Sequence, residues 1–230
     1  MRSRAVCSSC GPRDLAKLEP YKRFRHFEPG ETLASADEPL DFVATVVEGH
    51  IGLRRSLPDG RRQIVGLLFP GDFLGRPMRS SVPYDADALD SVTLCTIQRH
   101  GFERLLGELP ALEERLLAMA LDELDAARES LLLLGRKTAR EKVASFLLSV
   151  RRRTIAACSD GNGPGAEGGL PFPLPLGRED MADYLGLTIE TVSRQMSAFK
   201  KAALIALPTP RQVRYLDIAG LTAETGEHGV

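Results

Sequence analysis

The stretch GREDMADYLGLTIETVSRQMSAFKKAAL, residues 177 to 204, decides the fold class of the C-terminal part of the chain. It predicts two short helices around a tight turn, which is a helix-turn-helix. Gly186 supplies the turn, because a positive φ is cheap for glycine, and Thr188 is a candidate N-cap for the second helix. The predicted buried residues are Met181, Ala182 and Leu185 in the first helix, and Ile189, Val192, Met196 and Phe199 in the second.

The second helix carries side chains suited to reading DNA bases. Glu190, Ser193 and Arg194 share its other side near the N-terminal end, at spacing i, i+3, i+4. Arginine can donate two hydrogen bonds to guanine, glutamate accepts from the amino group of cytosine, and serine contacts a base or a phosphate. With Thr188 and Thr191 at the same end, these are the predicted DNA-binding residues. An ordinary amphipathic helix pair with a solvated polar face is the alternative for this pattern taken alone.

TIETVSRQMSAFKK, residues 188 to 201, closely resembles the recognition helix of the CRP/FNR superfamily of bacterial transcription regulators. The pattern E-x-x-S-R is that of its FNR branch, in which the matching Glu, Ser and Arg read TTGAT-type half-sites of a palindrome. The resemblance implies those roles for Glu190, Ser193 and Arg194. It also implies a homodimer that binds double-stranded DNA and works with RNA polymerase, in processes such as low-oxygen respiration, nitrogen fixation or photosynthesis.

The composition is that of a folded protein of two modest domains. The chain has 230 residues, of which 43% are hydrophobic and 27% charged. It has no apolar run of membrane-spanning length and no signal-peptide core at the N-terminus, so the expected compartment is the cytoplasm and no membrane partner is expected. The formal net charge of −1 does not indicate a nucleic-acid-binding protein. Any DNA surface must therefore be a local basic patch, for which the candidates are residues 151 to 153, Arg194, Lys200, Lys201, Arg211 and Arg214.

Residues 20 to 100 read as short strands separated by turns, which favours a barrel or jelly roll. The segment VVEGHIGLRRSLPDGRRQIVGLLFPGDFLG, residues 46 to 75, resembles the β-roll of cyclic-nucleotide-binding domains, with Gly49, Gly60 and Gly71 at its turns. A cyclic nucleotide needs a carboxylate for its ribose and charged donors for its phosphate. Here Arg76 replaces the expected glutamate, and the acidic YDADALD stands where the phosphate clamp belongs. We therefore expect no cyclic nucleotide.

Residues 110 to 135 predict one long helix that carries an apolar stripe of leucines. About 24 residues at about 1.5 Å each make a rod of about 36 Å, which is too long to be covered by one small β-roll. We predict that a second copy covers it, as a palindromic DNA site requires; the alternative is a helix packed only on its own domain. The predicted dimerisation residues are Leu117, Leu121, Leu124 and Leu131.

The fold class that follows is α+β: an N-terminal β-roll (jelly roll) of the cyclic-nucleotide-binding kind, a dimerisation helix and a C-terminal winged helix-turn-helix. The predicted domains are residues 1–109, the helix 110–135, and residues 136–230, in which ALIALPTPRQVRYLDI forms the wing and 158–169 a solvated loop. Residues 130 to 153 strongly resemble the FNR-type passage from dimer helix to DNA-binding domain, with Gly135 as the hinge.

The chain has four cysteines, which in a cytosolic protein favour thiols or metal ligands over disulfides. Cys7 and Cys10 form C-x-x-C, which alone is compatible with a zinc half-site, a redox pair or chance. SVTLCTIQRHGFERL, around Cys95, looks like the place where FNR carries its internal cluster ligand. The resemblance implies an oxygen-labile four-iron four-sulfur (4Fe-4S) cluster on Cys7, Cys10 and Cys95, one ligand short, because Cys158 lies in a loop of the DNA-binding domain.

The opening MRSRAVC resembles the last part of a ligand segment, C-x-x-C-P-x-R-x-R-A-V-C, found in several FNR-like regulators. The expectation is therefore that the biological start codon precedes Met1 and that two more cysteines lie upstream. The function predicted is a transcription regulator, and not an enzyme, that activates low-oxygen genes. Two alternatives stay open: a cluster-free, FixK-like regulator controlled by abundance or thiol redox, and, more remotely, a dithiol oxidoreductase.

Overall fold

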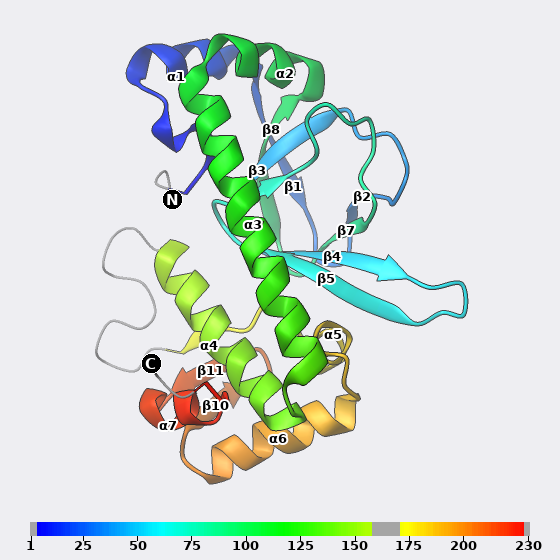
Figure 1. Cartoon of the computed structure of the whole chain (residues 1–230), viewed down its shortest axis with the longest axis vertical. Helices are drawn as coiled ribbons and strands as arrows, with labels where there is room; N and C mark the ends of the chain where they lie inside the picture. Colours follow the sequence, from blue (N-terminus) through cyan, green and yellow to red (C-terminus); the bar gives the residue numbers. More distant parts are fainter. Residues whose placement is uncertain (1–3, 158–170, 228–230) are drawn as a thin grey trace. The chain divides into compact units, whose positions relative to one another are not determined.

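The computed structural model describes residues 4–157 and 171–227 and divides the chain into two compact units, 1–126 and 127–230. The division falls inside the longest helix, α3, whereas the sequence predicts this helix as a separate segment between two domains. Figure 1 shows strands confined mainly to the first unit and helices dominating the second. The α-helices are α1 Pro12–Leu18, α2 Arg99–Glu108, α3 Pro110–Arg136, α4 Ala139–Ala157, α5 Arg178–Leu185, α6 Ile189–Lys201 and α7 Ile218–Ala223; two short 3-10 helices cover Val6–Ser9 and Glu19–Tyr21.

The first unit is a roll of two four-stranded antiparallel sheets, as the turn spacing predicts. One sheet has the order β1-β8-β3-β6 and the other β2-β7-β4-β5 (Figure 1). The strands are β1 Lys22–Phe27, β2 Thr32–Ala34, β3 Phe42–Glu48, β4 Ile51–Ser56, β5 Arg62–Leu68, β6 Phe73–Leu74, β7 Asp85–Ala88 and β8 Val92–Gln98. A cyclic-nucleotide-binding type of β-roll is thus confirmed as the N-terminal fold.

The predicted turn glycines do have positive φ: 81° at Gly49, 87° at Gly60 and 97° at Gly71. Gly49 is also required sterically, because a Cβ there would lie 2.3 Å from the backbone oxygen of Ser91. This glycine lets the β3–β4 turn approach the segment before β8 closely. The three glycines therefore act through turn geometry.

Apolar side chains fill the interior of the roll, including Val46, Ile51, Leu74 and Leu94. Strand β7, which comes from the acidic segment, alternates: its two alanines are buried and its two aspartates are half-buried. The aspartates are engaged locally, since Asp85 accepts from the amide of Ala36 at 2.8 Å and Asp87 from the hydroxyl of Thr32 at 2.7 Å. This strand therefore supplies carboxylates that accept hydrogen bonds within the roll, and it supplies no charged donors for a bound phosphate.

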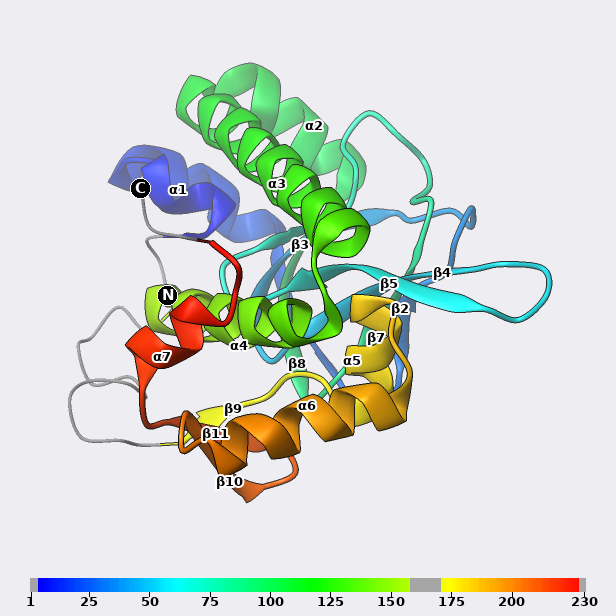
Figure 2. The same ribbon diagram turned by 60° about the horizontal axis from the view of Figure 1, so that its bottom comes forward.

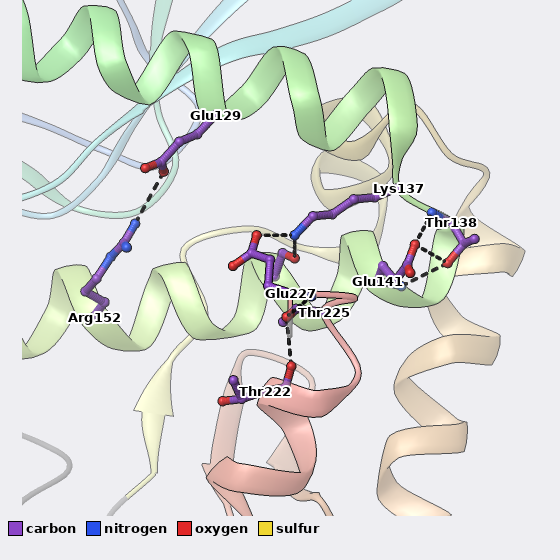
Figure 3. Close-up of polar contacts among 9 residues, drawn as sticks. Glu129, Lys137, Thr138, Glu141, Arg152, Thr222, Thr225 and Glu227 are labelled. Atoms are coloured by element: carbon purple, nitrogen blue, oxygen red, sulfur yellow. Dashed lines mark hydrogen bonds and ion pairs between the residues drawn. The ribbon is translucent and has the colours of Figure 1, made fainter. Parts of the chain in front are cut away.

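Helix α3 is long, as predicted, and Leu112 is its single fully buried residue. The predicted hinge at Gly135 is wrong, because the helix continues through that residue to Arg136. The break comes at Thr138, whose amide donates to the carboxylate of Glu141 at 2.7 Å and whose hydroxyl oxygen accepts from the amide of Glu141 at 3.4 Å (Figure 3). This is a capping box, which starts α4 at the next residue.

The second unit is a winged helix-turn-helix. Its small antiparallel sheet has the order β10-β11-β9, with strands β9 Phe172–Pro173, β10 Ile205–Thr209 and β11 Gln212–Tyr215, so the two predicted wing strands are confirmed. Val143, Leu147, Leu185, Val192 and Phe199 form its buried core. The predicted loop 158–169 lies outside the described residues. No helix in the described part of the chain is long and apolar enough to cross a membrane.

Candidate functional site

The turn between α5 and α6 has the geometry that the sequence predicts. Gly186 is left-handed, with φ 61° and ψ 44°, and the amide of Leu187 bonds back to the oxygen of Ala182 at 3.0 Å. Thr188 then caps α6 by accepting from the amide of Thr191 at 3.3 Å. Figure 2 shows α6 leaving this turn as a continuous helix at an angle to α5. The helix-turn-helix is therefore confirmed as a structural motif.

The two sides of α6 differ sharply. Val192, Met196 and Phe199 are fully buried, as predicted. Glu190 and Arg194 are exposed on the other side, and Ser193 is half-buried between them. The prediction for Ile189 is wrong: this side chain is 44% exposed, because it lies on the first residue of α6, beyond the end of the core. Sequence reasoning therefore missed an apolar side chain at the reading end, and its place directly after the N-cap was the available signal.

The N-terminal end of α6 is organised by local hydrogen bonds. The Thr188 hydroxyl donates to the hydroxyl of Thr191 at 3.1 Å. The pKa of Glu190 is lowered by a hydrogen bond from its own amide and by one from Thr188. Its carboxylate is thus a charged acceptor at neutral pH, near the positive end of the helix dipole. Such a group can accept a hydrogen bond from a base amino group.

The buried side of α6 is held from α4 and α7. The guanidinium of Arg140 lies 4.7 Å from the centre of the Phe199 ring, and both its Nε and Nη2 donate to the carboxylate of Glu224. A planar fork of this kind fixes orientation as well as distance. Arg140 therefore connects α4 with the reading helix α6 and with the C-terminal end of α7.

Several of the basic residues expected to form a patch also make contacts within the chain. Arg152 makes an ion pair with Glu129 at 3.6 Å, which Figure 3 shows between α3 and α4. Arg151 lies 6.0 Å from the centre of the Tyr215 ring, and Arg211 donates to the oxygen of Pro175 at 3.0 Å. The exposed basic side chains among these candidates are Arg152, Arg194, Lys200, Lys201, Arg211 and Arg214.

In the first unit, two of the three predicted cluster ligands share one cavity. Cys7 and Cys95 line a cavity of about 20 Å³ together with Lys22 and apolar side chains from β3, β8 and α2. Cys10 is buried in the apolar cluster that adjoins it. The structure therefore brings together thiols that lie 85 to 88 positions apart in the sequence (Cys95 against Cys10 and Cys7).

The chemistry of these thiols is that of buried groups. Burial raises the pKa of Cys10, with a further contribution from Cys7, and burial also raises the pKa of Cys95. The cavity has room for about one water molecule. Among residues 4–157 and 171–227, no three His, Cys, Asp or Glu side chains are placed to hold a metal ion. The thiols of Cys7, Cys10 and Cys95 therefore lie in the same region, but they are not arranged to coordinate a metal ion together. Cys158 lies outside the described residues.

The four predicted dimerisation leucines lie on α3. Leu117, Leu121, Leu124 and Leu131 are all exposed in the single chain, by 45 to 73%. Their spacing of three, four and seven residues places them on one stripe of the helix. The residues that the structure describes leave this stripe uncovered.

Comparison with known proteins agrees with both halves of the fold. Residues 141–224 match the Crp-like helix-turn-helix domain, and residues 24–108 match the cyclic nucleotide-binding domain. The chain is 50% identical to the transcriptional activator protein FnrL of Cereibacter sphaeroides, over 99% of this chain and 90% of the relative. It is 43% identical to the nitrogen fixation regulation protein FixK of Bradyrhizobium diazoefficiens, over 90% and 84% respectively. The structure of FixK2 from Bradyrhizobium japonicum aligns with a TM-score of 0.80 at 32% identity, covering 90% of this chain and 99% of that one.

Proposed function

Since the chain belongs to the CRP/FNR family of transcription regulators, in its FNR-type branch, we propose that it activates transcription by binding a palindrome of TTGAT-type half-sites as a homodimer. The observation that carries the proposal is the outward side of α6. Glu190 and Arg194 are exposed next to Ser193, on a helix whose opposite side is fully buried. Three polar groups on a rigid support at a helix N-terminus suit the major groove.

The leucine stripe of α3 supports the homodimer. Leucines at spacings of four, three and seven residues are covered best by an identical stripe on a second helix. A two-fold axis along α3 also gives two copies of α6, which a palindrome needs. Each copy then reads one half-site.

The target genes proposed are those used at low oxygen, including genes of nitrogen fixation, with RNA polymerase as the partner at the promoter. The proposal rests on the relatives, one of which is named as a transcriptional activator and another as a nitrogen fixation regulator. No cyclic nucleotide is proposed as the signal. Its phosphate needs charged donors, and β7 supplies half-buried carboxylates instead.

For the signal itself we propose a 4Fe-4S cluster that reports oxygen, with Cys7, Cys10 and Cys95 as ligands. The proposal is supported by the cavity that Cys7 and Cys95 share and by the burial of Cys10 beside it. Binding would require the thiols to lose their protons and the side chains around the cavity to make room, since the cavity holds about one water molecule and the described residues do not form a ligand set. Among the described residues, no side chain is identified as the fourth ligand.

The alternative is a cluster-free, FixK-like regulator, and the packing of Cys10 within an apolar cluster favours it. A buried thiol that stays protonated is inert, and packed as in the structure Cys10 serves as a small apolar residue. The same observation speaks against a dithiol oxidoreductase, because that chemistry needs a cysteine whose pKa is lowered.

DNA recognition is tested by fluorescence anisotropy of the full chain with three duplexes: a palindrome of two TTGAT half-sites, one with a single half-site, and a scrambled one. We expect the palindrome to bind at least about a thousandfold more tightly than the scrambled duplex. The single half-site should fall between them. Equal affinity for all three duplexes would overturn the proposal.

The cluster is tested by measuring iron, acid-labile sulfide and visible absorption of the protein purified without oxygen. Two variants are compared. Cys95→Ser removes a proposed ligand, and Ser91→Cys, four residues earlier and directly before β8, adds a thiol that the proposal does not use. Iron and colour that bleach in air, and that Cys95→Ser abolishes while Ser91→Cys does not, are the expected result. Protein that holds no iron in its native host would leave the cluster-free alternative.

A further inference from the structure

A lysine is buried in the middle of the helix-turn-helix unit. Lys142, on α4, is 8% exposed and lies between the capped first turn of that helix and the core residues Val143 and Ala144. Burying an ammonium costs free energy unless its charge is satisfied. The partner of this ammonium therefore indicates what the lysine does.

That partner is the carbonyl end of α5. The Nζ of Lys142 donates to the backbone oxygen of Leu185 at 3.1 Å. Leu185 is the last residue of α5, so its oxygen has no partner within the helix, and the helix dipole is negative at this end. A cation here satisfies an orphan acceptor at the point where the chain turns towards α6.

The contact lies directly beside the element that sets the direction of α6. Gly186, which follows Leu185, is left-handed, and Thr188 caps α6 two residues later. Fixing the oxygen of Leu185 fixes the peptide plane before Gly186, and therefore the start of the turn. Because Arg140 holds Phe199 further along α6, the helix is held from α4 at both its entry and its buried face.

We propose that Lys142 is a positioning residue for DNA recognition: it holds the α5–α6 turn so that Glu190 and Arg194 meet base edges in register. An apolar side chain of similar length would fill the same space, but it would leave the oxygen of Leu185 without this donor. The ammonium therefore fixes the geometry of the turn as well as filling the space. Hydrogen bonds to bases are steep in distance and angle, so a small rotation of α6 removes discrimination before it removes binding.

The test is Lys142→Met in the full chain, with Lys142→Arg as the conservative variant. Affinity is measured by anisotropy for the palindrome and for the same duplex with the base pair read by Arg194 replaced in each half-site. For Lys142→Met we expect the ratio of the two affinities to fall about tenfold in a protein that still folds, with a melting temperature only a few degrees lower because one carbonyl loses its donor. Lys142→Arg, which can still donate to the oxygen, should keep most of the ratio. An unchanged ratio in a folded Lys142→Met protein would overturn the proposal.

A second measurement needs no variant and so does not depend on folding of Lys142→Met. In the wild-type protein, NMR of ¹⁵N-labelled lysine should show one ammonium protected from solvent exchange, with a coupling across the hydrogen bond to the carbonyl carbon of Leu185. A rapidly exchanging Lys142 ammonium would also overturn the inference.

The inference rests on the proposed reading role of α6, and a parallel Arg194→Ala variant separates the two. If Arg194→Ala leaves the affinity ratio intact, the proposed reader is wrong. If Arg194→Ala lowers the ratio and Lys142→Met does not, only the role of Lys142 fails.

Discussion

Helices α3 and α6 both expose side chains to solvent, but α3 exposes a row of leucines and α6 exposes polar and charged groups. The exposed side of α6 carries Glu190 and Arg194. On its other side, Val192, Met196 and Phe199 are fully buried. The 27 residues of α3 bury a single leucine fully and expose a leucine stripe. Polar groups lose nothing in water, whereas exposed leucines lose the free energy of burial. Thus α6 is structurally complete within one chain and α3 is not.

The comparison predicts that the two helices fail in different ways. A substitution on the stripe of α3 should change assembly first and DNA binding as a consequence. A substitution on the exposed side of α6 should change DNA binding alone. A substitution behind α6 should change the local stability of the C-terminal unit.

The largest effect is expected from Leu121→Glu. A dimer buries two copies of this leucine, and each fully buried leucine contributes about 1.5 to 3 kcal/mol. The dissociation constant of the dimer should therefore rise by at least about a hundredfold, measured by sedimentation equilibrium, and palindrome affinity should fall with it. The control is Leu216→Glu, since Leu216 is also 54% exposed but lies outside α3. A Leu121→Glu monomer that still binds the full palindrome tightly would contradict the difference between the helices.

The next effect is expected from Arg194→Ala, which removes a side chain that one chain does not need for its fold. It should cost roughly 1 to 3 kcal/mol for each base pair that is no longer read and relax the preference at one position of each half-site. Binding to a panel of single-base-pair variants of the palindrome measures both. Lys201→Ala, at the far end of α6, should instead weaken binding to every duplex alike and reduce its salt dependence. A uniform loss from Arg194→Ala would make this arginine a phosphate contact.

A smaller effect is expected at Ile189, the one large apolar side chain exposed on α6. Placed at the reading end, it can contact a thymine methyl group. Ile189→Ala should cost about 0.8 kcal/mol of palindrome affinity, the value of about one buried methyl-sized contact. The same variant should show no loss on a palindrome with deoxyuridine in place of the contacted thymine. Losses of equal size on the two duplexes would assign Ile189 to the fold instead.

The sequence was most informative where the relevant residues are contiguous. The turn at Gly186, the cap at Thr188 and the polar triplet on α6 depend on neighbours within a few positions, so spacing alone predicts them. The pattern of short strands separated by turns in the roll followed for the same reason. Such features depend on the geometry of one helix or one hairpin.

Three features could not be predicted in this way. Ile189 has the spacing of a core residue, and only the end of the core at Val192 leaves it exposed. The sequence predicts the α3–α4 break at Gly135, but the break lies at Thr138. A glycine can remain helical at a cost, and the capping box between Thr138 and Glu141 fixes the start of α4. The buried amine of Lys142 depends on Leu185, which lies 43 positions away, and nothing in the local pattern of α4 indicates that contact.

The smallest effect tests whether α6 is held from within the chain. Glu224 bonds Arg140, which stacks on Phe199, and this hydrogen bond lowers the pKa of Glu224 below the usual 4.5. A lowered carboxyl pKa stabilises the fold above the unfolded value, and the stabilisation is lost as the pH falls from about 4.5 through the folded value. Glu224→Gln should therefore cost under about 1 kcal/mol at pH 7, because both partners are about one-third exposed, and progressively less as the pH falls below about 4.5.

Hydrogen exchange of peptides covering α4, α6 and α7 measures this loss directly, and Glu227→Gln is the matched control. Glu227 pairs with Lys137 at the same end of α4 (Figure 3), but its side chain is 69% exposed, so its loss should be smaller still. Faster exchange in Glu224→Gln with an unchanged dimer would show that the frame of α6 lies within one chain. If Glu224→Gln instead weakened the dimer, the hold on α6 would extend to the second copy, and the contrast between α3 and α6 would not stand.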